Sequence, residues 1–283
     1  MPRVFLTECP RDAMQGIKPF IPTEVKVTYL QSLFRVGFDV LDFGSFVSHK
    51  AVPQMRDTHE VIRQLDLSDT QTKLLAIVAN ARGAEDALQY PQIDFLGYPF
   101  SISENFQVRN TNKTIDESLV VLNKIANRVQ QAGKELVVYL SMGFGNPYGD
   151  PWSPALVAEW VEKLVQMGIQ RISLSDTVGV AQPKTITTLF EHVLSVHPDL
   201  FFGAHLHAKP NEAIAKLAAA YNGGCRAFDS AIRGLGGCPM AKDELTGNVP
   251  TEKLVSFLTH QKVDFKLNTL HFESAYNASF QVC

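Results

Sequence analysis

Eight short apolar stretches divide the chain at fairly even intervals. Their apolar positions run continuously instead of alternating with polar ones, which is typical of strands buried on both faces of a parallel sheet. β-Branched and aromatic residues are frequent in them. The stretches cover residues 3–8, 38–45, 72–80, 93–100, 135–143, 171–176, 200–207 and 226–232.

Helical spacing of apolar residues fills most of the intervals between these stretches. Three such segments open at Thr or Ser and close at Gly, the residues that commonly cap the two ends of a helix; they are 23–37, 114–133 and 153–168. Four more continue the alternation, at residues 183–198, 210–224, 252–262 and 267–281.

Strands that alternate with helices eight times predict a (β/α)₈ barrel, the TIM-barrel architecture. The 283 residues suit one such domain, because these barrels commonly use about 250 residues. We therefore expect a single domain over residues 1–283, with an accessory C-terminal helix over residues 264–283. A doubly wound open sheet is the alternative, but no GxGxxG sequence follows the first strand.

Composition and charge narrow the class of partner. The formal net charge is −3 and no long run of Lys or Arg occurs, which argues against nucleic acid or an anionic membrane as a partner. The four cysteines form no CxxC pair and fit a reducing compartment. The N-terminus lacks a signal-peptide core, and no apolar run approaches the roughly 20 residues of a membrane span. We expect a cytoplasmic protein.

Polar side chains follow the predicted strands at the end where barrel enzymes carry their chemistry. Because they come from distant parts of the chain and would converge on one mouth, we treat them as candidates for a single site. They are Arg11, Asp12 and Gln15 after the first strand, Asp42 and Ser45 in the second, Ser141 in the fifth, Ser173 and Asp176 in the sixth, and His205 and His207 in the seventh.

His205 and His207 stand two residues apart, so in a strand their side chains point to the same face. With an oxygen ligand from elsewhere, for which Asp12 and Asn248 are candidates, two imidazoles suit a divalent cation such as Mg²⁺ or Mn²⁺. Zn²⁺ is less favoured, because no thiolate is clearly among the ligands. The alternative is that both histidines are polar tips of a strand, bonded to neighbouring backbone.

One arginine and several carboxylates at the predicted strand ends are a second indication of a functional site. Arg11 can hold a carboxylate or an enolate oxygen with its forked guanidinium, or it can form an ordinary ion pair with Asp12. Asp42 and Asp176 end apolar strands, where an unpaired carboxylate is costly. They therefore orient Arg11 or a ligand, or they belong to structural ion pairs.

The segment RGLGGCPMA at residues 233–241 is the third signal. Its glycines allow a loop that moves and passes close to a ligand. Cys238 within it could transfer a proton or attack a carbonyl. The alternative is a flexible strand-to-helix loop with an incidental cysteine.

Five segments together resemble the hydroxymethylglutaryl-CoA lyases, which belong to a wider group of metal-dependent (β/α)₈ lyases and Claisen-type synthases. The segments are TECPRDAMQ, LDFGSFVSHKAVPQM, SLSDTVGV, HLH and GLGGCPMA…TGNVPTE, in the same order over nearly the whole chain. GLGGCP is the most specific of them. The resemblance implies an acyl-CoA thioester substrate and a retro-Claisen cleavage of 3-hydroxy-3-methylglutaryl-CoA to acetoacetate and acetyl-CoA, in leucine catabolism.

Position by position, the resemblance implies roles for most of the candidates. The metal ligands would be Asp12, His205, His207 and Asn248. Arg11, beside Asp42 where the family has Glu, would stabilise the enolate that becomes acetyl-CoA, and Cys238 would take part in proton transfer to it. Either His205 or Asp12 would be the base. Candidates for substrate binding are then Gln15, Ser45, Ser141, Ser173 and Asp176.

Several residues depart from the family's pattern. Ala208 and Lys209 follow the second histidine where an acid is usual, so a carboxylate that orients a ligand could be missing. Asp42 replaces Glu, Ala13 replaces Gly, Arg233 stands where a small residue is common, and the loop from the cysteine to Asn248 is one residue longer than expected. These departures leave open a diverged paralogue that acts on another 3-hydroxyacyl-CoA or a 2-hydroxy acid.

Two functions of other kinds stay open. A Claisen-type synthase that joins acetyl-CoA to a 2-oxo acid would share the RD and HxH sequences but usually lacks GLGGCP. A catalytically silent barrel that binds a metal or an acyl-CoA is supported only by the altered residues after His207. Many barrels of this type form dimers, so a homodimer is also open.

Overall fold

Eight parallel strands form a closed barrel in the computed structural model, which describes residues 3–237 and 246–282. Each strand pairs with its neighbour in sequence, and β1 pairs with β8. The predicted TIM barrel is confirmed, and every predicted apolar stretch contains or nearly coincides with one strand. The strands are β1 Phe5–Glu8, β2 Val40–Ser45, β3 Lys73–Ile77, β4 Ile93–Ser101, β5 Glu135–Ser141, β6 Arg171–Asp176, β7 Phe201–Leu206 and β8 Ala227–Ser230.

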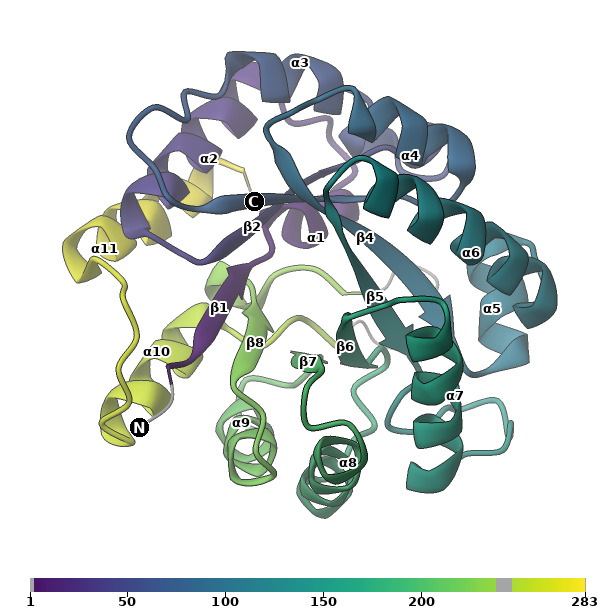
Figure 1. The fold of residues 1–283 in the computed structure, drawn as a ribbon. Coiled ribbons are helices and arrows are strands. Elements are labelled where there is room, and N and C mark those ends of the chain that lie inside the picture. Colours follow the sequence, from purple (N-terminus) through teal and green to yellow (C-terminus); the bar gives the residue numbers. More distant parts are fainter. Residues whose placement is uncertain (1–2, 238–245, 283) are drawn as a thin grey trace.

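Helices surround the barrel (Figure 1). Those predicted from apolar spacing are α2 Thr23–Val36, α6 Ile115–Gln131, α7 Pro154–Gln166, α8 Pro183–Val196, α9 Ala213–Asn222, α10 Thr251–His260 and α11 Thr269–Ala278. The expected accessory helix is α11, which packs against α2. The spacing does not predict α1 Pro10–Gln15, α3 Thr58–Gln64, α4 Ala81–Leu88 or α5 Glu104–Thr111. Short 3-10 turns occur at Pro53–Met55, Ile232–Gly234 and Ser279–Gln281.

Two of the three predicted N-terminal caps are present. The Thr114 side chain accepts a hydrogen bond from the Glu117 backbone N–H, and the Glu117 carboxylate accepts one from the Thr114 backbone N–H, which is a complete capping box. Ser153 accepts from the Leu156 backbone at 3.1 Å. Thr23 instead is the first helical residue of α2, after Pro22, and its hydroxyl donates to Asp57.

The described part of the chain contains no helix that has both the length and the apolar composition needed to cross a membrane.

The interior of the barrel has an apolar side and a polar side. The apolar side is a buried cluster from β3, β4 and β5, separate from the larger core between the barrel and its helices; it comprises Leu75, Ile77, Phe95 and Tyr139. Ser173 of β6, the register partner of Tyr139, and Asp229 of β8 form the polar side. A cavity of about 910 Å³ opens at the N-terminal end of the barrel and is lined in part by both of these residues. The functional side chains lie on the polar side, towards the other end.

A buried carboxyl group on β1, that of Glu8, bonds to the segment that follows β8. Glu8 accepts hydrogen bonds from the Ile232 backbone at 2.7 Å and from the Thr251 hydroxyl at 2.6 Å. Complete burial raises the pKa of Glu8 to about 8, although both hydrogen bonds act to lower it. Glu8 therefore keeps its proton in the folded protein through most of the neutral range.

A Glu8→Gln variant should have a free energy of unfolding that depends less on pH. The folded protein holds the Glu8 proton more tightly than the unfolded chain, since the pKa of Glu8 is about 8 when buried and 4.5 for an ordinary glutamate side chain. Wild-type stability should thus fall as pH rises through this window, by up to about 1.4 kcal/mol per pH unit from this group. Urea unfolding at several pH values measures the difference, and parallel curves for the two proteins would contradict the assignment.

Candidate functional site

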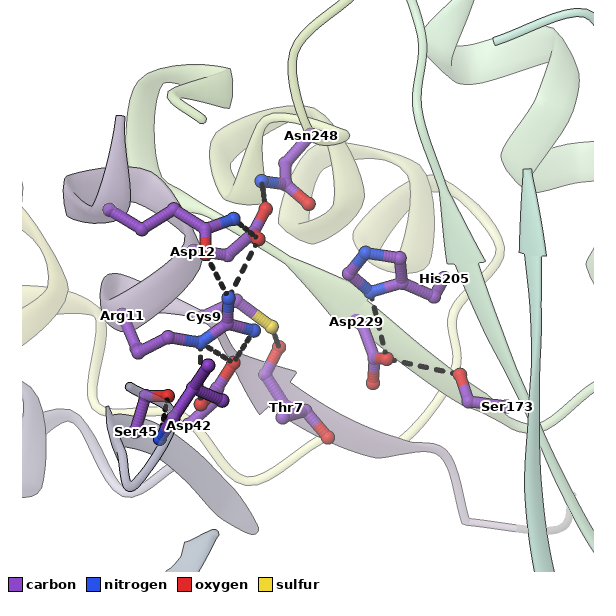
Figure 2. A network of polar contacts seen from close by, with 12 residues as sticks. Thr7, Cys9, Arg11, Asp12, Asp42, Ser45, Ser173, His205, Asp229 and Asn248 are labelled. Carbon is purple, nitrogen blue, oxygen red and sulfur yellow. Dashed lines mark hydrogen bonds and ion pairs between the residues drawn. The ribbon is translucent and has the colours of Figure 1, made fainter. Parts of the chain in front are cut away.

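Arg11 lies at the centre of a buried polar network at the C-terminal end of the barrel (Figure 2). Its Nε donates to the two carboxylate oxygens of Asp42 at 3.0 and 3.2 Å, and its Nη2 donates to one of them at 2.5 Å. Its Nη1 donates to Asp12 at 3.0 Å and to Gln15 at 2.9 Å. Helix α1, which begins at Pro10, carries Arg11, Asp12 and Gln15 to this position.

The charges in this network fix the protonation of its members. Burial raises the pKa of Asp42 to about 6, although Arg11 counteracts the shift. Burial also acts to raise the pKa of Asp12, but Arg11 and the two histidines outweigh it, so that pKa is lowered. For Arg11 the effect of burial is outweighed by both carboxylates, which raise its pKa. At neutral pH the site therefore holds a charged guanidinium between two ionised carboxylates.

His205 is oriented by a carboxylate from the neighbouring strand. Its Nδ1 lies 3.1 Å from Asp229 Oδ2, which also accepts from the Ser173 hydroxyl at 3.1 Å. Figure 2 shows these three side chains in a row, with the other ring nitrogen of His205 turned away from Asp229. Burial acts to lower the pKa of His205, but the hydrogen bond and charge of Asp229 raise it overall. The pair leaves Nε2 free for a ligand.

His207 presents a buried nitrogen that has no hydrogen-bond partner among the described residues. Its Nδ1 lies 3.0 Å from the Thr177 carbonyl oxygen. A carbonyl can only accept, so Nδ1 carries the hydrogen and Nε2 carries the lone pair. Burial, with His205 nearby, lowers the pKa of His207 to about 4. Since Nε2 is buried and unpartnered, it has the properties of a metal ligand.

The four predicted ligands come together. Ligand atoms of Asp12, His205 and His207 lie within 4.8 Å of one another. Asn248 forms an isolated antiparallel bridge with His207, and its Nδ2 donates to Asp12 at 2.5 Å and to the Leu235 carbonyl at 2.8 Å. The carbonyl oxygen of this amide is then the atom that could bind a cation. Two imidazole nitrogens with a carboxylate and an amide oxygen fit a divalent cation.

Comparison with known proteins places the chain in a family. A family model described as HMGL-like matches residues 4–278. The chain belongs to this HMGL-like family. Hydroxymethylglutaryl-CoA lyase YngG of Bacillus subtilis is 35% identical over 259 residues, which are 92% of this chain and 85% of that protein. The mitochondrial hydroxymethylglutaryl-CoA lyase of Bos taurus is 36% identical over 251 residues, 88% of this chain and 76% of its own length.

Solved structures of HMG-CoA lyases share the fold. The lyase from Acinetobacter baumannii, in complex with coenzyme A and 3-methylmalate, has a TM-score of 0.91 and 28% identity, and covers 99% of this chain and 91% of its own. The HMG-CoA lyase of Bacillus subtilis has a TM-score of 0.90 and 33% identity, and covers 97% of this chain and 92% of its own. The HMGL-like family is enzymatic and divalent-metal dependent, and the Asp12–histidine cluster is a possible metal site.

The predicted substrate-binding residues have varied surroundings. Ser45 is buried at the end of β2, where its hydroxyl accepts from the Val47 backbone at 3.2 Å. Ser141 is buried at the end of β5, opposite Ser101 of β4. The Ser173 hydroxyl donates to Asp229. Gln15 accepts a hydrogen bond from Arg11. Asp176 pairs with Lys216, a buried lysine on α9. Substrate contacts of these five residues stay a prediction.

The described part of the glycine loop, residues 233–237, lies close to the predicted ligands. Cys238 lies outside residues 3–237 and 246–282, so its catalytic role stays a prediction. Gly236 has a φ of 95°, and a Cβ there would lie 2.7 Å from both Asn248 Nδ2 and the Asp12 carbonyl oxygen. Glycine at this position therefore lets the chain lie directly against two of the ligands.

The departures from the family's pattern surround the same mouth. Ala208 is buried, and its backbone donates to the Gly247 carbonyl at 3.0 Å. Lys209 is exposed beside it, and both residues line a cavity of about 320 Å³ together with Asn248. Arg233 has a left-handed backbone and its guanidinium stacks over the Phe280 ring at 4.0 Å.

Two contributors to this HMGL-like site were not predicted from the sequence. Asp229 lies within the apolar stretch RAFDSAI, where a single acid was the available signal of a buried polar contact. Lys216 lies in the alanine-rich segment AIAKLAAAYN, where one lysine resembles an ordinary solvent-facing charge. Both are buried. Asp229 bonds to the ring of His205, and Lys216 bonds to the backbone carbonyl of His207.

Proposed function

We propose that the protein is a hydroxymethylglutaryl-CoA lyase that uses Mg²⁺ or Mn²⁺ to cleave 3-hydroxy-3-methylglutaryl-CoA into acetoacetate and acetyl-CoA. The observation that carries the proposal is the buried, unpartnered Nε2 of His207 within the Asp12–His205–His207 cluster, next to Arg11. The relatives that bear the lyase name support it. A cytoplasmic homodimer with a role in leucine catabolism is part of the same proposal.

The cation would be held by Asp12, His205, His207 and Asn248. Bound there, it supplies Lewis-acid polarisation of a substrate oxygen, which makes the tertiary alcohol easier to deprotonate. His205 and Asp12 are the two candidates for the base. Asp229 would make His205 a stronger ligand or base, because a carboxylate at hydrogen-bond distance from Nδ1 raises the basicity of the imidazole.

Arg11 would stabilise the enolate that forms when the carbon–carbon bond breaks. Its hydrogen bonds to Asp42, Asp12 and Gln15 engage four of its five N–H groups, which leaves one N–H on Nη2 for the substrate. The guanidinium is held rigid by these contacts, so it need not reorganise as negative charge develops. Cys238, on the loop that follows Gly236, would transfer the proton to the enolate.

The proposal is tested by incubating the purified chain with 3-hydroxy-3-methylglutaryl-CoA and measuring acetyl-CoA by liquid chromatography. We expect product with Mg²⁺ or Mn²⁺ and none after chelation by EDTA. Thiol release from acetyl-CoA and a 2-oxo acid would indicate a Claisen-type synthase instead. Binding of the thioester without turnover would indicate a silent barrel, and turnover of other 3-hydroxyacyl-CoA thioesters alone would indicate a diverged paralogue.

A further inference from the structure

We propose that Lys216 is a positioning residue that sets the orientation of the metal ligand His207. Lys216 lies on α9, is 3% exposed, and donates to three acceptors from two other segments. Its Nζ lies 2.7 Å from Asp176 Oδ2, 2.9 Å from the Gly179 carbonyl and 2.9 Å from the His207 carbonyl. An ammonium group has three protons, so each is used. This inference rests on the metal site proposed above.

The three contacts fix both the backbone and the ring of His207. The bond to the His207 carbonyl holds its main chain directly. The bonds to Asp176 and Gly179 hold the turn between them, and within that turn the Thr177 carbonyl accepts from His207 Nδ1 at 3.0 Å. Because Nδ1 is held by this turn, the opposite ring nitrogen points in one direction, towards the cluster with Asp12.

Further hydrogen bonds hold the turn at residues 176–179 in place. The Asp176 carboxylate also accepts from the Ala181 backbone at 3.1 and 3.2 Å. The Thr177 hydroxyl accepts from the Met142 backbone at 3.0 Å, which links the turn to the end of β5. Lys216 adds a side-chain link from this turn to the His207 carbonyl, beyond the pairing of Asp176 with Leu206. Its removal therefore loosens the turn that holds the His207 ring and the backbone of His207 together.

Lys216 supports His207 although the acid that usually follows the second histidine in the family is replaced by Ala208. The residue after His207 is a buried alanine, whose methyl group cannot orient a neighbouring ligand by a hydrogen bond. Lys216 reaches the same histidine from α9 instead and neutralises the charge of Asp176. A buried lysine is costly unless it is fully paired, so its complete set of acceptors is consistent with a dedicated role at this place.

The test uses a variant in which no unpaired charge is left in the interior. Lys216→Met combined with Asp176→Asn removes the ion pair as a whole, whereas Lys216→Met alone would leave a buried carboxylate and could unfold the protein. Mn²⁺ binding is measured by electron paramagnetic resonance of the free ion, without any turnover. We expect the dissociation constant for Mn²⁺ to rise roughly 10- to 100-fold, the range typical of residues that orient a ligand. Lys216→Gln with Asp176→Asn, which keeps N–H donors, should recover part of the affinity.

The chain offers a matched control in a second buried lysine pair. Lys26 on α2 lies 2.6 Å from Asp57 and is 2% exposed. Among the described residues, neither Lys26 nor Asp57 bonds to His207 or to its turn. Lys26→Met with Asp57→Asn should lower the melting temperature but leave Mn²⁺ affinity unchanged.

The outcomes separate this inference from the proposed function. If the wild-type chain binds no Mn²⁺, the metal site fails and this inference fails with it. If the wild type binds Mn²⁺ and the folded Lys216 double variant binds it equally well, Lys216 does not position His207 while the metal site stands. Equal weakening in the Lys216 and Lys26 double variants would assign the effect to general stability and overturn the proposal.

Discussion

An Arg11→Lys variant should fold normally and lose most of its lyase activity, with kcat reduced roughly 100- to 1000-fold. Lysine keeps the positive charge between Asp42 and Asp12, so no buried carboxylate is left without a cation. It cannot reproduce the forked contacts, because one ammonium group does not span Asp42, Asp12 and Gln15 at the distances that the guanidinium reaches. The remaining N–H that would meet the enolate is lost as well.

Steady-state formation of acetyl-CoA measures this effect, and circular dichroism verifies the fold. Arg3 offers a matched control, since it also pairs with an aspartate, Asp39, near the N-terminal end of the barrel. Arg3→Lys should leave kcat within a few-fold of wild type. If Arg11→Lys also retained wild-type kcat, the role of Arg11 at the developing enolate would be refuted.

A His207→Ala variant should raise the dissociation constant for Mn²⁺ by more than about 100-fold, above the range expected for residues that only orient a ligand. The substitution removes the buried Nε2 lone pair, and no other nitrogen is positioned to replace it among the described residues. Turnover should fall in parallel and recover in part at high metal concentration, because the other three ligands remain.

Isothermal titration with Mn²⁺ gives the affinity directly. His197 near the end of α8 is a suitable control, because its Nε2 is also buried without a hydrogen-bond partner but faces only Glu162 at 3.6 Å. His197→Ala should bind Mn²⁺ as the wild type does. Unchanged affinity in His207→Ala would remove this residue from the set of ligands.

The strands could be predicted from the sequence because each lies in a short, mainly apolar stretch, as strands buried on both faces of a parallel barrel require. Helices such as α6 could be predicted as well, since 17 residues are enough to show an apolar stripe and both caps. Helices of six to eight residues, α1, α3, α4 and α5, are too short for such a stripe. Helix α4 follows Asn80, whose side chain caps the helix by accepting from the Gly83 backbone, a cap that was not predicted.

The four metal ligands could be proposed because residues at the carboxyl ends of barrel strands share one mouth, and family resemblance completed the set. The contacts that orient them could not be derived in this way. Asp229 faces the interior from the middle of an apolar strand, and Lys216 is buried only because the turn after Asp176, 40 residues earlier, lies over α9. Such contacts depend on tertiary packing, which periodicity along one segment does not encode.

The pairing of β1 with β8 has a consequence during translation. Strand β1 needs Phe5 to Glu8 matched with Ala227 to Ser230, and α2 rests against α11 near the other end of the chain. While the ribosome is still synthesising the later strands, β1 lacks its β8 partner and α2 lacks its contact with α11. Barrel closure is then a late step that depends on contacts of very large sequence separation, which fold slowly. Until then the nascent chain exposes one unpaired edge of β1, the kind of surface that chaperones protect.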